Sequence, residues 1–169
     1  NASFEMWFRP DSLGTNQLLF ETGGGTRGAG LRLNADGTVL FVSRGGNGGN
    51  NSVITSTDTA DVNEFVQVVG VNDVINDEIR IYINGVENGS GVSPNRNWDG
   101  TDDAGLGIDQ NALPGQLNPF SAFDGDIPLF RVFDTALTDE EVLSLFDAQF
   151  APVPEPSTVA LALAAIVGA

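Results

Sequence analysis

Residues 123–150 (FDGDIPLFRVFDTALTDEEVLSLFDAQF) constrain the fold more than any other stretch of the chain. The apolar run at residues 127–133 predicts a strand, and the polar pair Asp134-Thr135 predicts its end. A short helix is expected from Thr138, because Thr138 and Glu141 have the spacing of a capping box. The strand is apolar on both faces, which predicts that it is covered on both sides. The segment therefore indicates a two-layer core that a small helix caps.

The helix itself carries further local signals. Leu137 and Val142 have the spacing of a hydrophobic staple, and three acidic residues occupy the first turn, where the helix dipole favours negative charge. Leu143, Leu145 and Phe146 then form an apolar stripe. We expect a short amphipathic helix.

The rest of the chain alternates short apolar runs with turn residues, which is typical of antiparallel strands. Hairpins are indicated at residues 34–37 (NADG) and at Asn84-Gly85. Within residues 78–84, Ile79, Ile81 and Ile83 are expected to point to one side. Further strands are predicted at residues 3–9, 17–21, 31–33, 38–43, 52–56, 64–71, 78–84 and 104–108.

Roughly ten short strands followed by one helix predict an all-β fold. We expect a two-sheet antiparallel β-sandwich (jelly roll) with one short C-terminal helix and an apolar C-terminal tail. An up-and-down barrel is the alternative, and the late helix argues against it. The expected divisions are a domain at residues 1–150, a spacer at 151–158 and an apolar segment at 159–169.

Composition excludes several classes of chemistry. The 169 residues include neither Cys nor His, so disulfides, His-based triads and His-containing zinc sites are excluded. The formal net charge of −16 predicts a surface that repels nucleic acid and anionic lipid. This charge serves solubility, or else it attracts divalent cations or a basic protein partner. Asn1 leads directly into a predicted strand, so we expect the mature N-terminus to have been trimmed or to lie upstream.

The C-terminal tail joins a Pro-rich spacer (APVPEPST) to a uniformly apolar run (VALALAAIVGA). The spacer is expected to be extended. The run is shorter than the ~20 residues that span a bilayer as a helix, and the sequence stops inside it. A buried terminal helix is one interpretation, and a membrane anchor or sorting segment is the other. The residues expected in the membrane segment are Val159, Leu161, Leu163, Ile166 and Val167.

Pro154, Glu155 and Pro156, directly before this apolar terminus, resemble the PEP-CTERM sorting signal of exported proteins in Gram-negative bacteria. The resemblance implies export to the periplasmic side of a membrane or to the cell surface. It also implies that a sorting protease of exosortase type acts on the tail. The family pattern ends in an Arg-rich cluster, which this chain lacks.

Three segments of the globular part stand in the order seen in one known family. They are FEMWFRP at residues 4–10, IYINGV at 81–86, and residues 123–142 with FDGDI and FDTALTDEEV at their ends. Together they resemble concanavalin A-like, laminin G-type jelly rolls over residues 3–148. The resemblance implies two antiparallel sheets and a non-enzymatic role in adhesion or glycan binding.

Some members of that family bind Ca²⁺, often with an Ile-Asp-Glu sequence after the glycine that corresponds to Gly125. Pro128 and Leu129 stand at the matching positions here, so the implied metal ligand is missing. A different candidate is the loop at residues 95–103 (NRNWDGTDD), in which oxygen-bearing side chains alternate before a glycine. A solvated acidic turn is the alternative, and no cofactor is required. The candidate ligands for a structural Ca²⁺ are Asn95, Asn97, Asp99 and Asp102.

Tyr82 and Trp98 are candidate plates for stacking on a sugar ring, and packing in the core or a hairpin is the alternative. Asp124 and Asp126 have the spacing to face one side, as a glycosidase pair would, but a role in capping the turn explains them as well. No catalytic residue is predicted, because Ser and Thr have no His to activate them.

The sequence thus predicts an exported, membrane-tethered or surface module that binds a glycan or a protein without catalysis. The alternative is an accessory subunit of a membrane-associated complex, held by its apolar tail. A glycan hydrolase or lyase is the third and weakest hypothesis.

Overall fold

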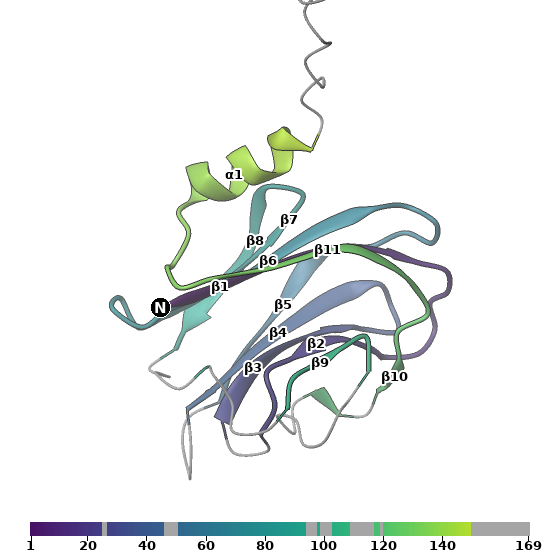
Figure 1. The fold of residues 1–169 in the computed structure, drawn as a ribbon, viewed down its shortest axis with the longest axis horizontal. Helices are drawn as coiled ribbons and strands as arrows, with labels where there is room; N and C mark the ends of the chain where they lie inside the picture. Colours follow the sequence, from purple (N-terminus) through teal and green to yellow (C-terminus); the bar gives the residue numbers. More distant parts are fainter. Residues whose placement is uncertain are drawn as a thin grey trace, which may run out of the picture.

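The computed structural model describes residues 1–24, 27–45, 51–93, 98, 103–108, 117, 118 and 120–149. These residues form a β-sandwich with one helix (Figure 1). The elements are β1 (Ala2–Pro10), β2 (Gln17–Glu21), β3 (Arg27–Leu33), β4 (Thr38–Gly45), β5 (Asn51–Thr59), β6 (Val66–Asp73), β7 (Glu78–Ile83), β8 (Val86–Val92), β9 (Gly105–Leu106), β10 (Ser121–Ala122), β11 (Gly125–Phe133) and α1 (Asp139–Ala148). The predicted all-β, two-sheet fold with a short C-terminal helix is confirmed.

The strands form two sheets that pack face to face. The five-stranded sheet has the antiparallel order β11-β1-β6-β7-β8. The second sheet has the order β10-β2-β3-β4-β5, with β9 paired to β2. Its pairs are antiparallel except β10 with β2. The last strands in the chain are edge additions: β11 pairs with β1 in one sheet, and β9 and β10 pair with β2 in the other.

The core lies between the sheets and is built by residues that alternate along each strand. Phe4, Met6 and Phe8 of β1 are buried there. Ile79, Ile81 and Ile83 of β7 join them, as their period of two predicts. The sheets approach closely enough that a Cβ at Gly70 would lie 2.8 Å from the ring of Phe41, so only glycine fits at this position.

The predicted hairpins are confirmed by backbone geometry. Asn84 and Gly85 have φ values of 50° and 81°, the left-handed pair that a tight β7–β8 turn requires. Gly37 has a φ of 90° in the turn that joins β3 to β4. The predicted strand at residues 104–108 is shorter than expected, since only Gly105 and Leu106 pair with β2.

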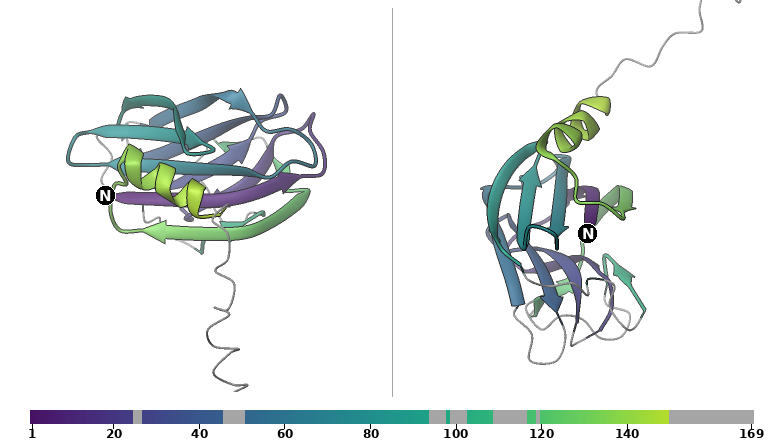
Figure 2. Two further views of the ribbon diagram at one scale, coloured as in Figure 1. Left: turned by 90° about the horizontal axis from the view of Figure 1, so that it is seen from above. Right: turned by 90° about the vertical axis from the view of Figure 1, so that its left-hand side faces the viewer.

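The helix begins where the capping box predicts. The hydroxyl of Thr138 accepts a hydrogen bond from the Glu141 backbone, and the Glu141 side chain accepts one from the Thr138 backbone. Val142 is the buried residue of α1 and packs with Leu137, so the predicted staple is confirmed. The helix lies across the outer face of the five-stranded sheet, as Figure 2 shows from above.

One expectation is wrong. The strand β11 was expected to be covered on both faces, but none of its residues is buried. It is also an edge strand, which pairs only with β1 among the described elements. Its residue Val132 is 50% exposed. Pro128 fits this position, since a residue without an N–H is tolerated at the edge of a sheet. Its apolar residues are only partly covered: Ile127 and Phe130 pack against the core, and Phe133 packs against the cluster that contains Leu137 and Val142.

Candidate functional site

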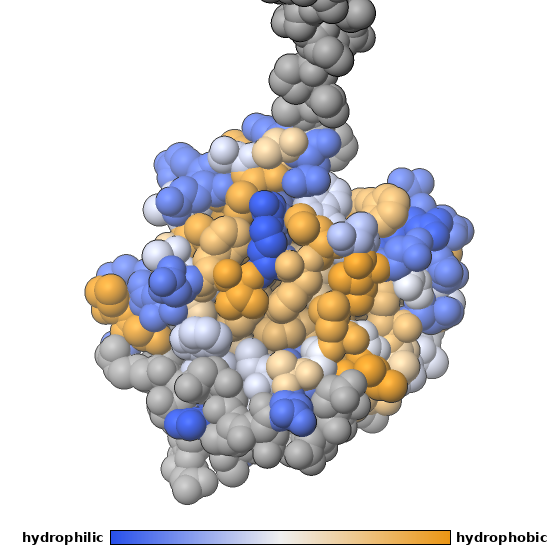
Figure 3. Space-filling view, in the orientation of Figure 1, coloured by the Kyte–Doolittle hydropathy of each residue, from blue (hydrophilic) through white to orange (hydrophobic). Residues whose placement is uncertain are grey.

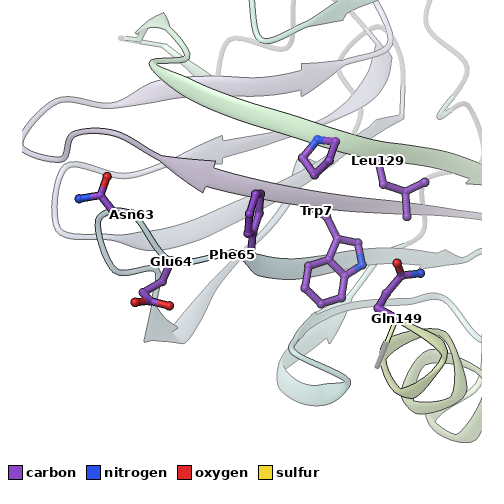
Figure 4. Close-up of a pocket in the computed structure, with 7 residues that line it drawn as sticks. Trp7, Asn63, Glu64, Phe65, Leu129 and Gln149 are labelled. Carbon is purple, nitrogen blue, oxygen red and sulfur yellow. The ribbon is translucent and has the colours of Figure 1, made fainter. Parts of the chain in front are cut away.

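A hollow of about 690 Å³ opens on the outer face of the five-stranded sheet, beside the C-terminal end of α1 (Figure 4). We call it the aromatic hollow, because two aromatic rings contribute to its wall. Its lining residues are Trp7, Asn63, Glu64, Phe65, Pro128, Leu129 and Gln149. They come from β1, the loop before β6, β11 and the end of α1, so four separate segments of the chain build one concave surface.

Strand pairing brings the two walls of the aromatic hollow together. Trp7 of β1 stands opposite Leu129 of β11 in the sheet. The register shifts between Trp7 and Arg9, a bulge that turns the end of β1 relative to β11. Trp7 is held in place because its ring stacks on Phe146 of α1, with centroids 5.8 Å apart and planes 5° from parallel. The helix therefore fixes the floor of the hollow.

The third wall is the loop that precedes β6. Asn63 has a φ of 66°, a left-handed conformation that Asn adopts more readily than most residues. Its backbone N–H donates to the carbonyl of Pro10 at 2.8 Å. This contact ties the loop to the end of β1 and places the next two residues, Glu64 and Phe65, on the rim.

Phe65 is the accessible aromatic ring of the hollow, since it is 51% exposed whereas Trp7 is 8% exposed. The guanidinium of Arg9 lies over the Phe65 ring, 5.6 Å from its centroid. Arg9 also pairs with Asp126, whose hydrogen bond and charge raise the pKa of Arg9. The ring therefore has a fixed cation on one side and an open side toward the hollow.

The polar part of the lining consists of two amides and one carboxylate, on Asn63, Gln149 and Glu64. Glu64 is the single charged lining residue among the described ones. In a chain with a net charge of −16, this hollow disfavours anionic ligands. Apolar rings flanked by amides and a carboxylate suit a neutral ligand with hydroxyl groups.

A buried ion pair lies beside the hollow, since Glu5 and Arg131 are two residues from Trp7 and Leu129 on the same strands. The carboxylate of Glu5 is fully buried and accepts hydrogen bonds from Arg131 at 2.7 Å and from the Gln67 amide at 2.8 Å. These three residues stand on β11, β1 and β6, so the cluster joins the edge strand to the sheet. It thereby keeps Leu129 in register with Trp7.

A second surface feature is apolar. Val132, Leu106 and Ile108 are about half exposed, at 50%, 47% and 50%. Val132 belongs to β11, whereas Leu106 ends β9 and Ile108 follows it. A Cβ at Gly107 would lie 3.7 Å from Ile127 of β11, so the segment after β9 approaches that strand. Figure 3 shows an apolar band over the face that β11 crosses. We call this band the apolar edge.

Neither of the two predicted sugar-stacking residues has a ring face that is fully open to solvent. Tyr82 is 1% exposed beneath α1, where its hydroxyl donates to Asp139 at 2.7 Å, so the stacking hypothesis is wrong for this residue. Burial and the bond to Asp139 raise the pKa of the Tyr82 hydroxyl. Trp98 is partly buried against the core, with its ring 5.5 Å from that of Phe4 in an edge-on arrangement. Core packing, the alternative for both residues, is what the structure contains.

The predicted acidic pair serves the turn before β11. The Asp124 carboxylate accepts a hydrogen bond from Ser12 at 2.7 Å, and Asp126 is paired with Arg9. Both carboxylates are therefore engaged in joining β11 to the end of β1. This is the turn-capping alternative to a glycosidase pair.

The candidate Ca²⁺ ligands Asn95, Asn97, Asp99 and Asp102 lie outside the described residues, so that site stays a prediction. Within the described part of the chain, no group of three or more Asp and Glu side chains is arranged to hold a metal ion. Residues 151–158, with Pro154, Glu155 and Pro156, and the apolar segment 159–169 also lie outside it. Within the residues that the structure describes, no helix is long and apolar enough to cross a membrane.

Sequence reasoning missed the aromatic hollow. Trp7 alternates with core residues along its strand, and Phe65 lies at the start of another predicted strand, so each has an ordinary structural explanation. An aromatic residue directly after the polar pair Asn63-Glu64 was the one local sign of exposure.

Comparisons with solved structures give the same fold. The carbohydrate-binding module CBM40 of the Ruminococcus gnavus IT-sialidase, bound to alpha2,3 sialyllactose, has a TM-score of 0.70 at 19% identity, covering 86% of this chain and 82% of the module. The native heptameric SAP-like pentraxin from Limulus polyphemus has a TM-score of 0.61 at 17% identity, over 86% of this chain and 69% of the pentraxin. The binding domain of botulinum neurotoxin serotype D has a TM-score of 0.62 at 16% identity, over 89% of this chain and 38% of that one.

A search of curated proteins gave no match. A family model described as the concanavalin A-like lectin/glucanases superfamily, of a laminin G type, matches residues 1–143. This match spans most of the chain and agrees with the two-sheet architecture. The chain therefore belongs to the laminin G-type branch of the concanavalin A-like lectin/glucanases superfamily.

Proposed function

We propose that this chain is a non-catalytic module that binds a neutral glycan in the aromatic hollow. The observation that carries the proposal is the geometry of the hollow, where the half-exposed ring of Phe65 stands beside Asn63, Glu64 and Gln149. An aromatic face packs against the C–H groups of a sugar ring, while amides and a carboxylate bond to its hydroxyls. A volume of about 690 Å³ is also in the range of small-ligand sites.

The charge of the chain separates this proposal from a sialic acid site. The Ruminococcus gnavus module is described in complex with a sialylated sugar, which is an anion. Here the net charge is −16, and Arg9, whose guanidinium lies over the Phe65 ring, is already paired with Asp126. Among the described residues that line the hollow there is no Arg, so a carboxylated sugar would meet repulsion there. A neutral glycan meets no such cost.

A glycan array with the full chain tests the proposal. The expected result is binding to neutral oligosaccharides and little binding to their sialylated counterparts at low ionic strength, with the difference shrinking as salt is added. Binding confined to sialylated glycans would contradict the site, and so would an array with no signal at any salt concentration.

We also propose that the chain is exported and held at a membrane or cell surface by its C-terminal tail. The support is the sequence Pro154-Glu155-Pro156 before an apolar run. Cell fractionation of the wild-type chain and of a variant with Pro154→Ala, Glu155→Ala and Pro156→Ala tests this. The wild type is expected in the membrane or surface fraction and the variant is expected to be mislocalised, whereas identical fractions would contradict a sorting role for the motif.

The second candidate function is that of an accessory subunit in a membrane-associated complex. The apolar edge favours it, because exposed apolar bands of this kind often mark protein-binding surfaces. Copurification distinguishes the two functions. Stoichiometric retention with other subunits, lost in the variant Val132→Ser, would support the accessory role, and a monomer that binds glycans supports the first.

A further inference from the structure

We propose that the aromatic hollow is also the docking site for the chain's own Pro-rich segment, residues 151–158. Docked there, the segment would compete with the glycan for one surface. The competition rests on the proposed function, but the docking does not. Three features of the chain carry the inference: where α1 ends, what lines the hollow, and what sequence follows.

The end of α1 delivers the chain to the hollow. Gln149 is the C-cap of the helix, with φ −74° and ψ −22°, and its backbone N–H donates to the Phe146 carbonyl at 3.1 Å. The same residue lines the hollow. Residue 151 is thus two positions beyond a lining residue. An extended segment with the ~3.1 Å rise per residue of polyproline II covers roughly 16 Å between residues 151 and 156, which is long for a hollow of about 690 Å³.

The chemistry of the segment matches the lining. Its prolines alternate at Pro152, Pro154 and Pro156, which favours the polyproline II conformation. Segments of this kind dock in grooves lined by aromatic side chains, since little conformational entropy is lost on binding. Phe65 supplies the exposed ring here and Trp7 a largely covered one, and Pro128 and Leu129 extend the apolar wall.

Residues at the rim of the hollow can supply hydrogen bonds to the docked segment. A polyproline II segment makes no internal hydrogen bonds, so its backbone carbonyls need outside donors. The side-chain amides of Asn63 and Gln149 stand at the hollow and can donate to them. Glu155 is the one charged residue of the segment, so the negative charge of the chain disfavours docking at that residue alone.

The tether makes even weak recognition effective. A segment joined by a short linker has an effective concentration in the millimolar range. If the free segment bound with a Kd of about 0.1 mM, docking in cis would weaken the apparent affinity for a glycan about tenfold. Drawing the tail into a bilayer, or removing it, would release the hollow. Glycan binding would then depend on whether the tail is inserted in a bilayer.

Two variants of the full chain test the docking. In the first, Pro152→Ser, Pro154→Ser and Pro156→Ser remove the polyproline bias and keep length and charge. In the matched control, Val159→Ser, Leu161→Ser and Leu163→Ser change the apolar run and keep the prolines. The two indole N–H signals of the chain, from Trp7 and Trp98, are followed by NMR, and glycan affinity is measured alongside.

We expect the Trp7 signal to shift in the proline variant and to stay unchanged in the control, with glycan affinity rising about tenfold in the proline variant alone. Unchanged Trp7 signals in the proline variant would overturn the docking, even if the glycan binds. A shift only in the control would assign the hollow to the apolar run instead.

Two further outcomes separate the hypotheses. A Trp7 shift in a chain that binds no glycan would uphold the docking and remove the proposed function. A wild-type Trp7 signal that changes on dilution would show docking between copies, which contradicts the intramolecular form.

Discussion

The guanidinium of Arg131 on β11 binds the fully buried carboxylate of Glu5 on β1, with Nε 2.7 Å from Oε2. The Gln67 amide on β6 donates to the other carboxylate oxygen. Three strands thus meet at one buried charge, and the outermost of them has no other sheet partner among the described elements. The cluster therefore adds side-chain bonds to the backbone pairing that attaches β11 to β1.

Arg131→Gln is expected to destabilise the fold by about 3 kcal/mol, at the low end for breaking a buried pair, because Arg131 is itself 38% exposed. The cost arises because Glu5 remains buried without its cation. The double variant Arg131→Leu with Glu5→Leu is expected to recover much of the loss, since neither charge is then left. Urea unfolding measures both, and a double variant as unstable as the sum of the single ones would contradict a coupled pair.

Gly85→Ala is expected to destabilise the chain more than Gly14→Ala. Both glycines have positive φ, at 81° and 94°, so both substitutions cost about 1 kcal/mol in backbone strain. A Cβ at Gly85 would in addition lie 3.0 Å from the Cβ of Phe146, whereas a Cβ at Gly14 would meet nothing within 4 Å. The difference in the free energy of unfolding measures the contact between the hairpin and α1. Equal losses would show that α1 does not press on this turn.

Asp73→Asn is expected to make the free energy of unfolding depend less on pH in the acidic range. Partial burial raises the pKa of Asp73, but hydrogen bonds from Asn76 and Ile75 outweigh it and hold the pKa below its ordinary value of 3.8. Stability from this carboxylate is therefore present above the ordinary pKa and is lost as pH falls through the lower folded value.

Urea unfolding of both proteins between about pH 6 and about pH 2.5 checks this prediction. The gap between wild type and variant should narrow on acidification, because the asparagine oxygen still accepts from the backbone of Ile75 and Asn76 at every pH. A constant gap across the range would contradict it.

Thr138→Ala is expected to cost about 1 kcal/mol and to weaken glycan binding, because the cap holds α1 and α1 positions both Trp7 and Gln149. Thr138→Ser keeps the hydroxyl and is the control. A loss of stability with unchanged glycan affinity would indicate that the hollow does not depend on the helix.

Local signals predicted much of this fold. The pair Asn84-Gly85 requires only its own backbone preferences, and Thr138 with Glu141 needs only a spacing of three, so both were readable from the sequence. The position of β11 was not, since apolar residues on both faces are equally compatible with a central strand and with a partly covered edge strand.

The aromatic hollow could not be predicted for a related reason. Trp7 and Leu129 are opposite one another only because β11 returns to pair with β1, and Phe65 joins them only through the turn at Asn63. These are long-range contacts that no local pattern encodes. Tyr82 shows the converse case, because its spacing on β7 gave no sign that a helix from the end of the chain would cover it.

The most direct test of the glycan site is the affinity of Phe65→Ala for a neutral oligosaccharide that the wild type binds. Phe65 is half exposed and belongs to no buried cluster, so its removal should leave the fold intact. Ile75→Ala, which removes an exposed apolar side chain that does not line the hollow, is the control. We expect at least a tenfold weaker Kd for Phe65→Ala, on the scale of 1.4 kcal/mol for one lost aromatic contact, and no change for the control. Equal affinities of Phe65→Ala and the wild type would contradict it.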